Sequence, residues 1–284
     1  MGLPIANRIL DQGYELRVFN RTPQRAENLI ARGATRCATP RDACTGAEAI
    51  ISMVSDDNAS REIWLGPDGA LSSASKPAAL AIECSTLSHD WVLELSSHAA
   101  TRRLRYIDSP VTGLPDHAAS GELTLLIGAD PSDLDTARPL LAAFSNRIIH
   151  FGSVGTGTAY KLLVNLLGAV QIASAAETVA VAERIGLDLG TVAQALSTGQ
   201  AASPQVIRNT RRMVEGRHEQ NVVFTPELRL KDVEYALALA RKVGLGAPFG
   251  ALAATLLRQL CALGHHQSNE SSLIEVARLQ PPDT

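Results

Sequence analysis

The sequence lacks a strong charge of either sign and lacks long apolar runs. Its 26 basic and 29 acidic side chains leave a formal charge of −3 and a pI near 6.2. That balance gives no electrostatic footprint for nucleic acid or for an anionic membrane surface. No apolar run approaches the ~20 residues that a membrane helix needs, and no basic segment followed by an apolar one opens the chain. We therefore expect a cytoplasmic protein that acts on a small molecule, with no nucleic-acid and no membrane partner.

Cysteine is also scarce, and its spacing excludes two classes of protein. The four cysteines show neither the paired spacing of a zinc site nor the density of a disulfide scaffold, so we expect reduced thiols. His265 and His266 are adjacent, but no further candidate ligands lie near them in the sequence. We expect a solvated turn there and no metal site. The cysteines are Cys37, Cys44, Cys84 and Cys261.

The chain is long enough for two domains, and its two halves differ in pattern. At 284 residues it exceeds the ~250 at which a single hydrophobic core stops growing, and 45% apolar residues suffice for two cores. The first half alternates short apolar runs with helical patterns, which predicts βαβ units around a parallel sheet. The predicted strands are residues 15–20, 49–54, 79–83, 104–108, 124–128 and 147–151, with helices at 4–12 and 23–32 among those between them.

The second half shows only amphipathic segments of helix length. The predicted fold is therefore α/β, a doubly wound sheet followed by an all-helical C-terminal domain, with the boundary near residues 151–155. We expect the last five residues to fray. The predicted helices are residues 156–185, 189–198, 204–215, 227–243 and 249–263.

The most informative motif is a glycine-rich turn that leads into a helix at residues 152–165. Three glycines precede an apolar run, so free N–H groups and the positive end of a helix dipole would face one anion. Lys161 and Asn165 are four residues apart and share one face of this helix. A lone helix lysine is usually solvated, but the following apolar segment predicts a partly buried one, whose lowered pKa would suit proton exchange.

At these residues the chain resembles the β-hydroxyacid dehydrogenase family, whose catalytic segment reads G-x-x-G-x-G-x-x-x-K-x-x-x-N. The resemblance implies that Lys161 is the general acid/base and that Asn165 helps to hold the substrate. It also implies that residues 1–151 form a Rossmann-type NADP-binding domain. Residues 152–280 would then form a helical domain for substrate binding and oligomerisation.

The segment after the first predicted strand bears on cofactor choice. Domains selective for NAD usually carry an acidic residue there, which bonds the ribose 2′-hydroxyl. This chain has Asn20, Arg21 and Thr22 instead, and a guanidinium pairs with a 2′-phosphate. In the resembling family this triplet accompanies NADP(H), so NADP is favoured and NAD remains possible. The alternative is an ordinary basic turn capped by Thr22.

The N-terminus departs from the family pattern. Family members begin with an apolar strand and G-x-G-x-M-G, whereas here Met1 and Gly2 align with the last Met-Gly, which makes Gly2 a cofactor residue. The missing strand is central in such a sheet, so its neighbours would keep unpaired backbone groups. We expect a mis-assigned start codon with roughly ten residues upstream. The competing explanation is a truncated protein with impaired cofactor binding.

Four further segments match the family in order and spacing. Two are cofactor turns at strand ends, and a third, 108–113, resembles the substrate segment D-A-P-V-S-G-G, with Leu114 in place of its second glycine. Lys231 lies seven residues after Phe224, as in the family's K-D segment, and is expected to contact cofactor or substrate. The expected cofactor residues of the two turns are Met53, Val54, Ser55 and Thr86; the expected substrate residues are Thr112, Gly113 and Gly155.

The resemblance spans residues 2–276 and implies an oxidoreductase that transfers hydride between NADP(H) and a small 3-hydroxy acid or its semialdehyde. The substrate would be a small carboxylate. An imine reductase is disfavoured because such enzymes replace the catalytic lysine, and phosphogluconate dehydrogenase because its helical domain is larger. A non-catalytic nucleotide-binding or assembly protein is the alternative if the missing strand is real. Surplus apolar surface in the helical half predicts a homodimer or homotetramer.

Overall fold

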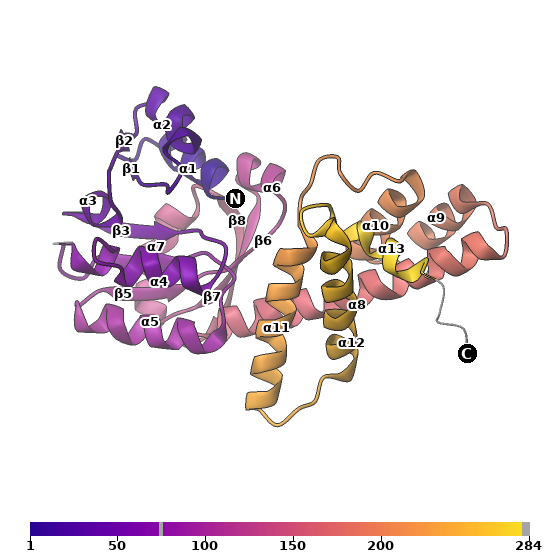
Figure 1. The fold of residues 1–284 in the computed structure, drawn as a ribbon. Helices are drawn as coiled ribbons and strands as arrows, with labels where there is room; N and C mark the ends of the chain where they lie inside the picture. Colours follow the sequence, from indigo (N-terminus) through magenta and orange to yellow (C-terminus); the bar gives the residue numbers. More distant parts are fainter. Residues whose placement is uncertain (74–75, 280–284) are drawn as a thin grey trace. The chain divides into compact units, whose positions relative to one another are not determined.

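The computed structural model describes residues 1–73 and 76–279 (Figure 1). Contacts divide the chain into two compact units, Met1–Lys161 and Leu162–Thr284. The division falls inside helix α8 (Thr156–Arg184), which begins in the first unit and continues into the second. The expected frayed end, residues 280–284, lies outside the described residues.

The first unit is built on a six-stranded sheet. Its strand order is β3-β4-β5-β7-β6, and β8 pairs with β7. Apolar side chains alternate between the two faces: Ile82 packs on one side and Ala81 on the other. The strands are β3 (Ala49–Ser52), β4 (Leu80–Glu83), β5 (Arg105–Asp108), β6 (Val111–Thr112), β7 (Leu123–Gly128) and β8 (Ser145–Gly152).

The α/β fold class is confirmed, and the sheet is mainly parallel, as predicted, with one strand reversed relative to two of its neighbours. Strands β3, β4 and β5 are parallel, whereas β7 runs antiparallel to both β5 and β6. A parallel crossover needs a dozen or more residues. Only the short helix α6 (Pro115–Ser120) and its turns separate β6 from β7, so β7 returns in the opposite direction.

Two further strands form a small sheet of their own. Strands β1 (Arg17–Val18) and β2 (Thr35–Arg36) are parallel and pair only with each other. Within residues 1–73 and 76–279, no strand joins β1 to β3, which is an edge of the larger sheet. The short strand β2 was not predicted.

Helices cover both faces of the larger sheet. Apolar side chains of α1, α6 and α7 pack in one core cluster, and those of α4 and α5 pack in the other. Asp56, Ser88 and Asp130 cap α4, α5 and α7 by accepting backbone N–H bonds. The remaining bounds are α1 (Gly2–Asp11), α2 (Glu27–Ala31), α3 (Pro40–Cys44), α4 (Asp57–Leu65), α5 (His89–Thr101) and α7 (Pro131–Leu141), with 3-10 turns at Pro23–Ala26 and Ala70–Ser72.

The second unit is helical, as predicted. Small and branched residues of α8, at the 3.6-residue spacing of a helix, face its core: Ala169, Ile172, Ala176 and Val179. A π turn follows α12 and ends at Gly264, whose φ of 93° favours glycine. The helices are α9 (Leu189–Thr198), α10 (Pro204–Glu215), α11 (Pro226–Lys242), α12 (Pro248–Leu260) and α13 (Ile274–Ala277), with short helical turns at Cys261–His265 and Glu270–Leu273.

Helix α8 corrects one reading of the sequence. Within the described residues it is long and apolar enough to span a membrane, with 44% of the qualifying window buried. The expectation that no segment approaches that length is therefore wrong. Length and composition are weak evidence of insertion, because the core helix of a soluble protein meets the same criterion.

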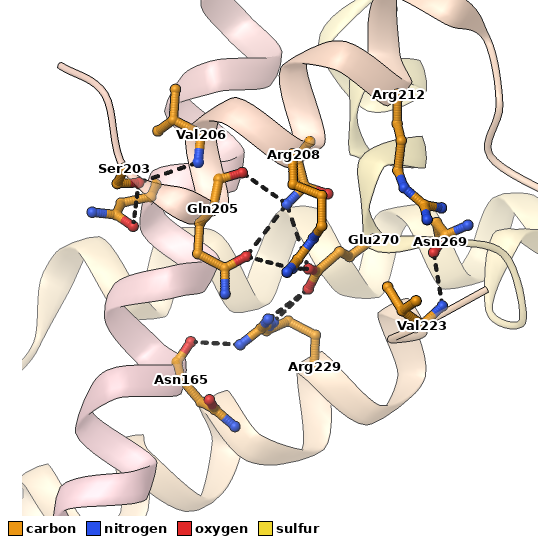
Figure 2. A network of polar contacts seen from close by, with 12 residues as sticks. Asn165, Ser203, Gln205, Val206, Arg208, Arg212, Val223, Arg229, Asn269 and Glu270 are labelled. Atoms are coloured by element: carbon orange, nitrogen blue, oxygen red, sulfur yellow. Dashed lines mark hydrogen bonds and ion pairs between the residues drawn. The ribbon is translucent and has the colours of Figure 1, made fainter. Parts of the chain in front are cut away.

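A buried ion-pair network ties the helices of the second unit together (Figure 2). The Glu270 carboxylate accepts hydrogen bonds from Arg229, at 2.8 Å to Nε, and from Arg208, at 2.8 Å to Nη2. Arg229 also donates to the backbone oxygen of Asn165 over 3.1 Å. Glu270 and Arg229 are almost fully buried. Because water does not reach them, each charge is stabilised by the other.

Candidate functional site

The first turn of α8 is bonded to the end of strand β5. The Asp108 carboxylate accepts a bond from the Thr158 backbone N–H over 2.8 Å and from the Thr158 hydroxyl over 2.6 Å. The backbone of Gly155 bonds to the same carboxylate. Asp108 and Thr158 are both fully buried. The turn thus binds an anion, as its glycines predict, but that anion is a side chain of the protein itself.

The glycines of this segment have two different roles. Gly152 and Gly155 have φ angles of 126° and 91°, which residues with a side chain rarely adopt. At Gly157 the constraint is space, because an added Cβ would lie 2.2 Å from the carbonyl oxygen of Leu126 on β7. At Gly128, on the same strand, an added Cβ would likewise lie 2.7 Å from the carbonyl oxygen of Ser153. The start of α8 is therefore pressed directly against the sheet.

The ionisation of Asp108 is perturbed. Burial raises the pKa of its carboxyl to about 7, against the lowering effect of the Thr158 and Gly155 hydrogen bonds, and nearby Glu83 raises it further. In the folded protein this pKa lies above the ordinary value of 3.8, so the folded state binds a proton at Asp108 more tightly than the unfolded chain does. The stability that folding gains from this proton is complete below about pH 4 and is lost as the pH rises through about 7.

Helix α8 carries both predicted catalytic side chains. Lys161 is half-buried, one turn beyond Thr158. Asn165 is buried, and its Nδ2 donates to the Asp232 carboxylate of α11 over 2.6 Å. Lys231 forms an ion pair with the same carboxylate, with 3.0 Å between Nζ and Oδ1. In the second unit the structure therefore brings Asn165 and Lys231 together through Asp232.

The predicted cofactor turns meet at the carboxyl ends of β3 and β4. Gly2, at the start of α1, faces Met53, because a Cβ added at Gly2 would lie 3.7 Å from the Cβ of Met53. The Val54 N–H donates to the Ser85 hydroxyl over 2.7 Å, which links the turn at Met53, Val54 and Ser55 to the turn at Ser85 and Thr86. This edge of a sheet is where ligands of open α/β folds bind.

Beneath these turns lies a buried carboxylate. Glu83 ends β4 and is fully buried. It accepts bonds from the indole N–H of Trp64 over 2.8 Å, the Ser60 hydroxyl over 3.0 Å and the Ser85 backbone N–H over 3.1 Å. Glu83 therefore fixes the start of the second cofactor turn. In the sheet it lies directly beside Asp108.

The segment expected to bind the adenosine ribose lies at the surface. Asn20, Arg21 and Thr22 are all exposed, and Asn20 Nδ2 donates to the Thr22 backbone oxygen over 2.7 Å. Among the residues that the structure describes, no carboxylate forms an ion pair with Arg21. Its guanidinium is therefore available to an external anion.

The predicted substrate residues lie on the antiparallel part of the sheet. Thr112 is half-buried on β6, opposite Thr124. Gly113 follows with a φ of 136°, and an added Cβ would lie 2.8 Å from the Leu123 side chain, so glycine is required. Leu114, the departure from the family pattern, is the N-cap of α6, and its N–H donates to His117 Nδ1 over 2.9 Å.

The described part of the chain contains no group of three or more His, Cys, Asp or Glu side chains placed to hold a metal ion. The four cysteines are free thiols, and burial raises the pKa of the Cys44 thiol to about 12. No observation in this region points to metal chemistry.

Comparison with known families gives two consecutive matches. Residues 1–152 match the family model described as the NAD binding domain of 6-phosphogluconate dehydrogenase. Residues 155–277 match the NAD-binding domain of NADP-dependent 3-hydroxyisobutyrate dehydrogenase. The chain belongs to the β-hydroxyacid dehydrogenase family.

Individual relatives within the β-hydroxyacid dehydrogenase family match nearly the whole chain. The NAD-dependent L-serine dehydrogenase of Pseudomonas aeruginosa is 32% identical over 280 residues, covering 95% of this chain and 92% of its own. The 3-hydroxyisobutyrate dehydrogenase of the same organism is 31% identical, covering 90% and 87%. A Mycobacterium tuberculosis 3-hydroxyisobutyrate dehydrogenase, solved with L-serine, is 27% identical with a TM-score of 0.88, covering 98% and 96%.

Sequence reasoning missed three residues that support the expected β-hydroxyacid dehydrogenase site. Asp232 bonds Asn165, Asp108 holds the first turn of α8, and Glu83 orders the Ser85 turn. The role of Asp232 could have been predicted from the sequence, because it directly follows Lys231 in the Lys-Asp pair. Only Lys231 was considered there. Glu83 and Asp108 each end a predicted apolar strand, and an acidic residue at that position is an unusual core residue.

Proposed function

We propose that this β-hydroxyacid dehydrogenase family member is an NADP(H)-dependent oxidoreductase that interconverts a small 3-hydroxy acid and its semialdehyde. The observation that carries the proposal is Lys161, held one turn after an anchored helix start, with Asn165 one turn further on the same helix. Relatives named 3-hydroxyisobutyrate dehydrogenase and L-serine dehydrogenase support the substrate class.

The side chains of α8 suit proton transfer and substrate orientation. Lys161 would donate a proton to the carbonyl oxygen in reduction and accept it from the hydroxyl in oxidation. An amide nitrogen carries two N–H donors, so Asn165 can keep its bond to Asp232 and still donate to substrate. Thr112 and Gly113 would hold the substrate carboxylate, through a hydroxyl and a backbone N–H.

The residues present fit a nicotinamide dinucleotide. Gly2, Met53, Val54, Ser55 and Thr86 lie at or beside the carboxyl ends of parallel strands, where such a group binds. When bound, the cofactor would supply the redox chemistry by exchanging a hydride with the substrate carbon. We also propose that Lys231 contacts the cofactor or substrate, and its ion pair with Asp232 would orient it.

NADP is the proposed cofactor rather than NAD because Arg21 has no carboxylate partner in the described residues. We predict that Arg21→Ala raises the KM for NADPH about tenfold or more, the effect of one lost charge-assisted bond, and leaves the KM for NADH little changed. Steady-state kinetics with both cofactors measure this. Arg138→Ala, an exposed arginine paired with Asp135, is the control. Equal effects on both cofactors would rule out 2′-phosphate recognition by Arg21.

We further propose a cytoplasmic homodimer or homotetramer that assembles through the second unit. Large apolar side chains are exposed there on α12 and on or directly after α8, including Phe249 of α12 at 75% and Ile185, which follows α8, at 67%. We expect light scattering of the purified protein to report two or four copies. A monomer at micromolar concentration would contradict this proposal. The other exposed apolar residues on these two helices are Tyr160, Leu163, Leu167, Val181 and Leu252.

The proposed function is tested first by fluorescence titration with NADPH and NADH. The account predicts saturable binding of NADPH, with weaker binding of NADH. If neither binds, the oxidoreductase proposal fails, and a non-catalytic role becomes the better explanation.

A further inference from the structure

We propose that Asp108 is a positioning residue, which fixes the first turn of α8 and thereby the place of Lys161. The proposal rests on the proposed function, in which Lys161 exchanges the proton. Asp108 itself is fully buried and reaches the site only through the backbone and hydroxyl of Thr158 and the backbone of Gly155.

The geometry makes Asp108 a fixed support for the helix. Its two carboxylate oxygens are both occupied, Oδ2 by the Thr158 N–H and Oδ1 by the Thr158 hydroxyl. The junction has no room to shift towards the sheet, because an added Cβ on Gly128 would lie 3.0 Å from Asp108 Oδ2 and 3.0 Å from the Gly157 nitrogen. Thr158 precedes Lys161 by three residues, so a displacement of the first turn moves the lysine with it.

These hydrogen bonds mean that the anion bound by the glycine-rich turn is the Asp108 carboxylate and not a substrate carboxylate. The N–H groups of a helix's first turn attract one negative charge, and here the Asp108 carboxylate supplies it. A substrate carboxylate cannot occupy the same donors. Gly155, expected from the family resemblance to bind substrate, therefore binds Asp108, which leaves the substrate carboxylate to Thr112 and Gly113.

Asp108 interacts electrostatically with the titratable groups around it. Beyond the effect of burial, Glu83 raises the pKa of the Asp108 carboxyl, and Asp108 in turn raises the pKa values of Cys84 and Tyr106. Loss of the Asp108 carboxylate should therefore reach Lys161 through the position of the first turn of α8, and a displaced lysine should alter the pH profile of kcat.

The test compares Asp108→Asn, Thr158→Val and Thr158→Ser in the full-length protein. Asparagine keeps the shape but lacks the second acceptor oxygen and the charge. We expect Asp108→Asn to lower kcat on the order of 10²-fold, the effect of a misplaced catalytic group, with KM and NADPH affinity little changed. The pH profile of kcat should change as well, because the displaced lysine would titrate in different surroundings. Thr158→Val should cost about tenfold, and Thr158→Ser, which restores the hydroxyl, should cost little.

Asp130→Asn is the matched control, because Asp130 caps α7 in the same unit at an exposed position and bonds within its own turn, to Ser132. It should leave kcat and its pH profile unchanged. Wild-type kcat and pH profile in both Asp108→Asn and Thr158→Val would overturn the proposal. An equal loss of kcat in Asp108→Asn and Asp130→Asn would also overturn it, because that result would indicate a general effect of losing a helix cap.

A second readout separates this proposal from the proposed function. Amide hydrogen exchange across residues 156–161 should accelerate in Asp108→Asn and Thr158→Val, whatever reaction the protein catalyses. Unchanged exchange there would show that the carboxylate does not hold the turn. If wild-type protein turns over no hydroxy acid but exchange still accelerates, the proposed function fails while the anchoring role of Asp108 stands.

Discussion

Substitution of Lys161 by alanine is expected to lower kcat on the order of 10²-fold or more, because it removes the group that we propose exchanges the substrate proton. KM should change less, since Asn165, Thr112 and Gly113 remain to bind the substrate. The measurement is steady-state kinetics in both directions, with NADPH affinity determined separately by fluorescence. Retained cofactor binding would place the defect in the chemical step.

Two further variants sharpen this test. Lys161→Arg keeps the positive charge, but a guanidinium does not release its proton near neutral pH, so it should be nearly as impaired as alanine. Lys76→Ala removes an exposed lysine that pairs with Glu48 and should retain full activity. An unchanged kcat in Lys161→Ala would remove this lysine from the acid/base role. Full activity in Lys161→Arg would show that only its charge matters.

The largest effect on stability is expected from Glu270→Ala in the second unit. The substitution leaves the buried Arg229 guanidinium without a carboxylate, and breaking such a pair costs about 3–5 kcal/mol. Arg208 would lose the same partner. The bond from Arg229 to the Asn165 backbone oxygen connects this network to the helix that carries the proposed catalytic residues.

The two units can be monitored separately during urea unfolding. Both tryptophans, Trp64 and Trp91, belong to the first unit, so their fluorescence reports that unit, whereas far-UV circular dichroism also detects the helices of the second. Glu270→Ala should shift the dichroism transition and leave the fluorescence transition nearly in place. Glu215→Ala, which breaks surface pairs with Arg211 and Arg217, should shift the dichroism transition far less, because water screens exposed ion pairs. Equal costs for the two glutamates would contradict a central role for the network.

Much of the fold was predictable because local pattern determines it. Helices α9 and α10 have the predicted bounds, and each begins after a side chain that caps it, Asp188 or Ser203. Strands β4 and β5 were predicted because each contains a short apolar run, residues 80–82 in β4 and residues 106–107 in β5. The reversed direction of β7 was not predicted, because it follows from the shortness of the connection after β6.

The proposed site was predictable only in part. Lys161 and Asn165 are on one helix, so their spacing indicated a shared face. Asp108 and Thr158 are 50 residues apart, and Asn165 and Asp232 are 67 apart. Contacts between distant segments leave no periodic signal in a single sequence. For the same reason the glycine-rich turn was expected to bind a ligand, whereas its anion comes from strand β5.

The central claim is NADP-dependent turnover of a small 3-hydroxy acid. Its most direct test follows NADPH formation at 340 nm with a panel that includes 3-hydroxyisobutyrate and L-serine, and NADPH consumption with the matching semialdehydes. The account predicts that at least one member of the panel is turned over, faster with NADP than with NAD, and that Lys161→Ala abolishes most of this activity. Tight NADPH binding without turnover of any hydroxy acid or semialdehyde would contradict it.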